Sequence, residues 1–278
     1  MNHAVQLSEL ELRFAWETQE VDTVADLNRV AAADLVARLR DAIAANRRLI
    51  AIVPVGPLDY SYWAEALNRE QLDGASLVTV NMDEYLDDDG RLVPLDHPLS
   101  FRRFMNESLF DRLEGKARMP EENRIFPDPD NPAAVTRLLE EHGADVCYAG
   151  IGLSGHLAFN DPPAAHEACD DGAVSESVTR ALELSEITRA QICLAGADGM
   201  WEIVPRRAVT VGMSEILASR QIYFALLRTW HAGLWRQAFF GPVTGRFPAS
   251  FVQQHRHVRV TATRVAAAAP ALHASLRV

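Results

Sequence analysis

Two short polar clusters follow apolar runs in this chain, and their residue types suit proton transfer. Asp83 and Glu84 come directly after one apolar run, and His156 and Asp161 follow another. A carboxylate can remove a proton next to a carbonyl, and an imidazole can give or take a proton near neutral pH. Each residue alone also fits a structural role, such as a helix cap or a core histidine. Their joint position after two strands favours a catalytic site.

The histidine lies in a glycine-rich stretch, residues 148–163, that follows an apolar strand. Its glycines at 150, 152 and 155 allow the backbone to approach a ligand. Open α/β sheets bind their ligands in such loops, at the carboxyl ends of parallel strands. The spacing resembles a dinucleotide-binding fingerprint, but two prolines at the end of the stretch stop any helix early. We therefore do not expect a nicotinamide site.

These clusters need elements to position them, and the chain alternates apolar runs with amphipathic helices. Strands are expected at 49–54, 76–81, 146–149, 208–211, 222–227 and 257–261, and helices at 24–46, 59–68, 101–113, 133–142, 214–219 and 230–240. The alternation predicts an α/β fold with a parallel sheet. A length of 278 residues with 48% hydrophobic residues fits a single domain with one large core.

Two segments give weaker signals. Residues 1–20 predict an opening strand or arm over 10–16, and residues 162–203 show weak periodicity apart from a short strand at 181–184. A long irregular segment inside a compact domain is typically a lid or an insertion. We treat 1–20 and 263–278 as peripheral parts of the domain, which spans 1–278.

Charge and cysteine content limit the class of protein. The formal net charge of -11 and the lack of a Lys/Arg-rich run argue against a nucleic-acid surface. The three cysteines lack metal-type spacing and predict reduced thiols in a cytoplasmic protein. No paired-histidine pattern predicts zinc, so no metal is expected. No run is long enough for a membrane span, and the N-terminus does not read as a signal peptide.

Four sequence motifs occur in the order of a known family. They are NMDEY at 81–85, HPLSF at 97–101, GIGLSGHLAFNDP at 150–162 and VTVGM at 209–213, and they anchor about residues 45–262. On these motifs the chain resembles the glucosamine-6-phosphate deaminase/isomerase family. The resemblance implies a single modified Rossmann-like domain, with a mostly parallel sheet and helices on both faces. It also implies a small-molecule sugar substrate, no cofactor and a homo-oligomer.

The resemblance also implies a mechanism and residue roles. The family opens an amino-sugar ring, moves a proton between C2 and C1 through an enediol-type intermediate, and releases ammonia to leave a ketose. By position, Asp83 matches the family's proton-shuttling carboxylate and His156 its ring-opening histidine. Asp161 matches a glutamate that orients this histidine. A second family acid falls on Ser154, which implies slower or differently assisted ring opening.

The family's phosphate-binding features are replaced in this chain. The usual Gly-Gly-Thr or Gly-Ala-Ser type loop after the first strand reads PVGPLDYS at 54–61. Pro57 has no amide hydrogen, Leu58 has no hydroxyl, and Asp59 repels a dianion. The family's lysine falls on His231. We hypothesise that the substrate is not an ordinary hexosamine 6-phosphate, or that it binds in a rebuilt pocket.

Two sets of residues are candidates for binding the substrate. The first set lies in the motifs or could replace a lost cation: Gly56, Leu58, Glu84, Gly155, Arg189, Arg228 and His231. The second set is aromatic, gathers beside the altered loop and lysine position, and predicts either core packing or a stacking pocket: Tyr60, Tyr62, Trp63, Trp230 and Trp235.

Three functions remain open at this point. The first is an amino-sugar (phosphate) deaminase/isomerase. The second is a sugar-lactone hydrolase, which would keep His156 but need less from Asp83. The third is a catalytically silent sugar-binding homologue, suggested by Ser154 and the altered phosphate loop.

Overall fold

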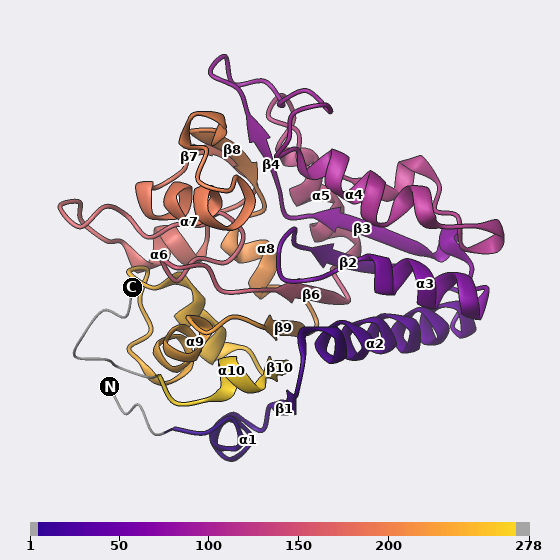
Figure 1. Cartoon of the computed structure of the whole chain (residues 1–278), viewed down its shortest axis with the longest axis horizontal. Helices are drawn as coiled ribbons and strands as arrows, with labels where there is room; N and C mark the ends of the chain where they lie inside the picture. The colour runs from indigo at the N-terminus through magenta and orange to yellow at the C-terminus, as the bar shows by residue number, and fades with distance from the viewer. Residues whose placement is uncertain (1–4, 271–278) are drawn as a thin grey trace.

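The computed structural model describes residues 5–270, and its centre is a seven-stranded sheet (Figure 1). In spatial order the strands are β1 (Glu17–Val21), β10 (Val258–Thr263), β9 (Ile222–Leu226), β6 (Val146–Ala149), β2 (Leu49–Val53), β3 (Leu77–Asn81) and β5 (Arg124–Ile125). All neighbouring strands in this sheet pair in parallel. The predicted α/β fold with a mostly parallel, Rossmann-like sheet is confirmed.

Helices cover both faces of the sheet, because successive strand residues point to opposite faces. In β2, residues 49, 51 and 53 enter one core, and residues 50 and 52 enter the other. The first core includes α2 (Val24–Ala44), α3 (Ser61–Glu70) and α4 (Phe101–Ser108). The second core includes α1 (Ser8–Phe14), α5 (Ala133–His142), α8 (Met213–Leu217), α9 (His231–Phe240) and α10 (Arg264–Ala267).

A second, antiparallel sheet lies beside the first and has the order β4-β8-β7. Its strands are β4 (Asp83–Leu86), β8 (Arg207–Thr210) and β7 (Arg180–Glu183). Because β4 begins two residues after β3 ends, Asp83 lies where the chain passes from one sheet to the other. The strands predicted at 208–211 and 181–184 are present, but they belong to this small sheet and not to the parallel one.

The chain start differs from the expectation. The strand predicted over 10–16 is wrong, since residues 8–14 form α1 and the strand β1 follows it. The sequence ELEL at 9–12 alternates like a strand, but the helix buries Leu10 and leaves Leu12 88% exposed. Residues 162–203 are also more regular than predicted, since they hold α6 (Asp171–Ser175), β7 and α7 (Glu186–Gly196).

The described parts of the two terminal segments are built into the core, so the expectation that they are peripheral is wrong for them. Trp16 and Ala266 are buried, and β1 is an edge strand paired with β10. The fully buried guanidinium of Arg236 donates to backbone carbonyls from both ends of the chain, including Val5 and Ala267. Residues 271–278 lie outside the described part. Among residues 5–270, no helix is long and apolar enough to cross a membrane.

Candidate active site

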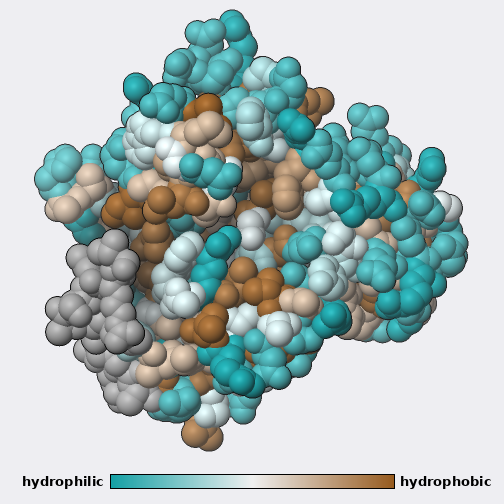
Figure 2. Space-filling view, in the orientation of Figure 1, coloured by the Kyte–Doolittle hydropathy of each residue, from teal (hydrophilic) through white to brown (hydrophobic). Residues whose placement is uncertain are grey.

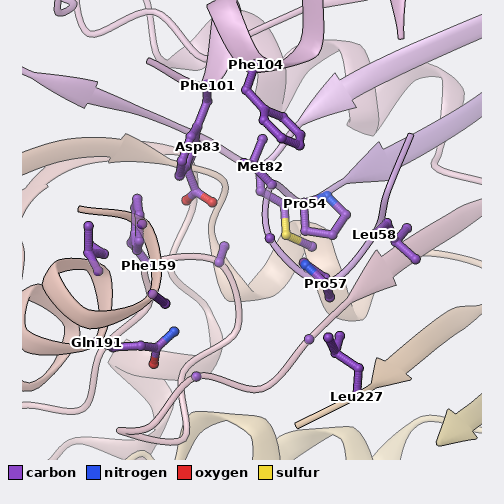
Figure 3. A pocket seen from close by; sticks show the side chains of 18 of the residues that line it. Pro54, Pro57, Leu58, Met82, Asp83, Phe101, Phe104, Phe159, Gln191 and Leu227 are labelled. Atoms are coloured by element: carbon purple, nitrogen blue, oxygen red, sulfur yellow. The ribbon is translucent and has the colours of Figure 1, made fainter. Parts of the chain in front are cut away.

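A cavity of about 690 Å³ opens where β2, β3, β6 and β9 end. The loops after these four strands form most of its wall, and residues of α4 and α7 complete it. Figure 2 shows a hollow on this face with hydrophobic residues along its walls. Figure 3 shows the lining at close range. This is the edge at which parallel α/β sheets bind ligands.

Asp83 lines the pocket from the first position of β4 and is only 6% exposed. The hydroxyl of Thr210 donates a hydrogen bond to its carboxylate. Burial raises the pKa of Asp83 to about 7, although the Thr210 hydrogen bond and the nearby His156 act in the opposite direction. A carboxyl group that titrates near neutral pH can both take and return a proton.

His156 lines the same pocket, in the loop after β6. Its Nδ1 lies 3.0 Å from Oδ1 of Asp161. Because an ionised carboxylate can only accept, Nδ1 carries the hydrogen, and the Nε2 edge is left for a substrate. Gly152 makes room for the ring, since a Cβ at this position would lie 2.0 Å from Nε2 of His156.

Asp161 does not line the pocket but supports His156 from behind. Its Oδ1 accepts hydrogen bonds from the hydroxyls of Ser154 at 2.6 Å and Thr188 at 2.7 Å. The amide of Ser185 donates to Oδ2 at 3.1 Å. Burial opposes ionisation of Asp161, but hydrogen bonds and charge from His156, together with the two hydroxyls, hold its pKa well below the usual range. The result is a fixed anion that orients the histidine.

Ser154 lies in the same cluster, behind the histidine. Its Oγ is 2.8 Å from Nδ1 of His156, and it does not line the pocket. A carboxylate at this position would repel the carboxylate of Asp161, whereas the serine hydroxyl is neutral and donates a hydrogen bond to it. Ser154 therefore supports the histidine and is not placed to touch a substrate.

Glu84 was a candidate for binding the substrate, but its side chain does not line the pocket. It is fully buried and accepts hydrogen bonds from the backbone amides of Phe101 at 3.0 Å and Arg102 at 2.8 Å. The Ser100 hydroxyl donates to it as well, at 3.0 Å. Glu84 thus satisfies the free amides at the start of α4.

Arg189 and Gly155 also lie away from the cavity lining. Arg189 is buried in α7, where it pairs with Glu186 at 2.8 Å and packs 4.3 Å above the ring of Trp201. Gly155 has a φ of +83°, and a Cβ there would lie 2.5 Å from the ring of Phe247. The contacts of both residues are therefore with side chains outside the cavity lining.

The loop between β2 and α3 lines the pocket through Gly56 and Leu58. Asp59 follows them and donates its amide to Oδ1 of Asn28 at 3.0 Å. Its own Oδ1 accepts from the amide of Ser61 at 3.0 Å and from the hydroxyl of the same serine at 2.6 Å. A carboxylate of the chain, two residues before α3 begins, therefore binds the amide of the first helical residue, at a helix end that would otherwise attract a bound anion.

His231 lines the pocket, but its ring is bonded to the backbone. Nδ1 accepts from the amides of Leu227 at 2.9 Å and Arg228 at 3.2 Å, and the ring also forms a hydrogen bond to the backbone of Ile151. Burial and the charge of Arg228 lower the pKa of His231 to about 4. His231 is therefore neutral at pH 7. Arg228 also lines the pocket, with its guanidinium 5.1 Å from the ring of Trp230.

The aromatic candidates divide into core and pocket residues. Tyr60, Trp63 and Trp235 are buried in the two cores. Tyr62 is half-buried and packs against the core that contains α3. Of the five, only Trp230 lines the cavity.

Sequence reasoning missed the roles of Thr188 and Thr210. Thr188 lies in the first turn of α7, inside the segment expected to be irregular, and the helix-start pattern at Ser185 was the available signal. Thr210 lies inside one of the four motifs, but its contact with Asp83 depends on the pairing of β4 with β8. Within residues 5–270, no group of three or more His, Cys, Asp or Glu residues is arranged to hold a metal ion.

The chain is similar to known bacterial enzymes over most of its length. It is 32% identical over 211 residues to a glucosamine-6-phosphate deaminase of Rhodopirellula baltica, a match that covers 75% of this chain and 78% of the relative. It is 34% identical over 206 residues to glucosamine-6-phosphate deaminase 2 of Bacillus subtilis, a match that covers 71% of this chain and 75% of the relative. The chain belongs to the glucosamine-6-phosphate deaminase family. This confirms the resemblance carried by the four motifs.

The fold of the chain is similar to that of solved structures. A monomeric glucosamine-6-phosphate deaminase matches with a TM-score of 0.75 at 24% identity, over 90% of this chain and 98% of that structure. A 6-phosphogluconolactonase from Shewanella baltica matches with a TM-score of 0.60 at 19% identity, over 89% and 97%. No protein-family model matches the chain. The chain is therefore a divergent member of the glucosamine-6-phosphate deaminase family.

Proposed function

We propose that the protein is an amino-sugar deaminase/isomerase, which moves a proton within an open-chain aldose and releases ammonia. The observation that carries this proposal is the presence, in one pocket, of a buried carboxyl group with a pKa near 7 and an oriented histidine. These are Asp83 and His156. The deaminase relatives support the same reaction.

Ring opening is the task of His156. Its Nε2 takes the proton of the anomeric hydroxyl and delivers a proton to the ring oxygen, so the bond from C1 to that oxygen breaks and an aldehyde forms. Asp161, held as an anion, stabilises the imidazolium that exists between these two steps. Acid–base catalysis of this kind typically contributes about 10²–10⁴-fold in rate.

Proton transfer is the task of Asp83. Its carboxylate takes the proton from C2, and the electron pair forms a double bond between C1 and C2 as the π pair of the C1 carbonyl moves onto its oxygen. The carboxyl group then returns the proton to C1 as the nitrogen lone pair forms a double bond to C2, and one proton passes from this nitrogen to the C1 oxygen. The product is an imine at C2. Water adds to the imine carbon, and ammonia leaves as the ketose carbonyl forms. A pKa near 7 suits Asp83 for both halves of this transfer.

Ammonia release from a panel of phosphorylated and free amino sugars tests the proposal. The expected result is ammonia and the corresponding ketose in equal amounts. Hydrolysis of sugar lactones without ammonia release would instead identify a lactonase, a function found in proteins that share this fold. Sugar binding without any turnover would identify a silent homologue.

We further infer a cytoplasmic homo-oligomer. The three cysteines form no disulfide, which supports a reducing compartment. Four apolar side chains on α7 and just after it are exposed, which supports a contact between copies of the chain: Ile187, Leu194, Met200 and Trp201. Light scattering should give a mass above that of one chain, and the mass of a single chain at every concentration would overturn the oligomer.

A further inference from the structure

Several hydrophobic side chains line the part of the pocket that is built by the loops after β2 and β9. Figure 3 shows Leu58 and Leu227 on the side of the pocket away from Asp83. Phe104 and Trp230 add aromatic surface to the same cavity. The cavity volume of about 690 Å³ is typical of pockets for ligands larger than one sugar ring.

A phosphate group would meet a fixed negative charge beside these residues. The carboxylate of Asp59 lines the pocket and holds the start of α3 through Ser61. It thus binds the first amide of that helix, and it repels a second anion nearby. Pro57, in the same loop, has no amide hydrogen to offer.

The cations that could offset this charge are few. Among residues 5–270, Arg228 is the lining side chain with a permanent positive charge, since His231 is neutral and bonded to the backbone. Arg189 lies away from the lining and pairs with Glu186. A phosphate carries about −1.5 to −2 charges at pH 7, so one arginine beside Asp59 does not balance it.

We propose that the substrate of this site is an amino sugar whose end remote from the amine is uncharged and carries an apolar substituent. This inference rests on the proposed function. The reacting carbons lie at Asp83 and His156, and the apolar substituent packs against Leu58, Leu227 and Trp230. Arg228 is left to bond the sugar hydroxyls.

Calorimetric binding of unreactive open-chain sugar alcohols tests the inference without turnover. The probes are 2-amino-2-deoxyglucitol, its 6-phosphate and its 6-O-benzyl ether. The benzyl ether is expected to bind about tenfold tighter than the parent, because its ring is buried against apolar walls. The 6-phosphate is expected to bind no tighter than the parent. Preferred binding of the 6-phosphate, or equal binding of the benzyl ether and the parent, overturns the inference.

Lysine variants give a matched control for charge. Leu58→Lys adds a cation to the pocket, so binding of the 6-phosphate should tighten about tenfold and binding of the benzyl ether should weaken. Leu12→Lys adds the same charge at a side chain of α1 that is 88% exposed and outside the cavity lining. This control should leave all three affinities unchanged. An equal gain in phosphate binding by both variants contradicts the inference.

Ammonia release from the matching aldoses separates this inference from the proposed function. If only glucosamine 6-phosphate is deaminated, the substrate inference fails and the deaminase proposal stands. If the benzyl ether probe binds most tightly but no aldose releases ammonia, the inference about the pocket stands and the deaminase proposal fails.

Discussion

Thr210 lies directly opposite Asp83 in the antiparallel pairing of β8 with β4, and its hydroxyl donates to the Asp83 carboxylate. The small sheet therefore fixes the carboxylate that the mechanism requires. The same hydrogen bond favours the charged form of Asp83, while burial favours the neutral form. The balance of these two effects places the pKa near neutral pH.

The first prediction concerns the pH dependence of activity. Because Asp83 must be ionised to take the C2 proton, kcat/KM should rise with pH and level off above about 7. Thr210→Val removes a hydrogen bond to the ionised carboxylate and should move this midpoint to higher pH. Thr210→Ser keeps the hydroxyl and should leave the midpoint in place. A flat profile between pH 5 and 8 contradicts the assignment of Asp83 as the base.

The second prediction concerns stability. The pKa of Asp83 is about 7 in the folded chain, against an ordinary value of 3.8 for an aspartate. Folding is therefore less favourable at every pH at which the unfolded chain has lost this proton. The penalty is absent below pH 3.8, grows between pH 3.8 and 7, and is constant above pH 7. At about 1.4 kcal/mol per pKa unit, it reaches at most about 4 kcal/mol.

Asp83→Asn removes this penalty while keeping an acceptor for Thr210. Its free energy of unfolding should exceed that of the wild type at pH 8, and the difference should shrink as pH falls toward 4. Urea unfolding at several pH values measures it. A variant less stable than the wild type at pH 8 would contradict the conclusion that the buried, ionised Asp83 carboxylate destabilises the folded chain.

The third prediction concerns Thr188, a positioning residue. Thr188→Val removes the hydroxyl that donates to Asp161 and so weakens the support of His156. Losing one hydrogen bond to a charged group should lower kcat about tenfold, with little change in KM. Thr188→Ser keeps the hydroxyl and should retain most of the activity. If the valine and serine variants lose activity equally, packing and not the hydrogen bond explains the role of Thr188.

The fourth prediction concerns Gly152. A Cβ at this position would lie 2.0 Å from Nε2 and 2.3 Å from Cε1 of His156, so Gly152→Ala must displace the imidazole. Misplacing a catalytic group by about 1 Å costs about 100-fold in rate, and kcat should fall by that order. Gly233→Ala is the control, because no heavy atom lies within 4 Å of its added Cβ. Equal activity of the two variants would count against the role of His156.

Much of the fold could be predicted because the central strands are continuous apolar runs. LIAIV at 49–53 and VCYA at 146–149 are buried on both faces, as parallel strands with helices on both sides must be. The small sheet was not predictable as a unit. The strand at 181–184 was predicted, but the sequence did not show that β7 pairs with β8 outside the parallel sheet.

The site was predictable where chemistry follows a strand end. Asp83 and His156 lie in the segments that follow buried strands β3 and β6, so sequence order alone brings them to one edge of the sheet. Thr188 reaches Asp161 from 27 residues further along the chain, which no local pattern reports. Glu84 resembled a site residue for the same reason as Asp83, but the neighbouring strand position turns it toward the start of α4.

Single-turnover release of ammonia at pH 8, by the wild type and by Asp83→Asn, tests the central claim most directly. Asp111→Asn, which removes an exposed carboxylate outside the pocket, is the charge control. With an amino sugar that the wild type deaminates, Asp83→Asn should be slower by about 10²–10⁴-fold and Asp111→Asn should match the wild type. Ammonia release by Asp83→Asn at the wild-type rate would contradict proton transfer by Asp83.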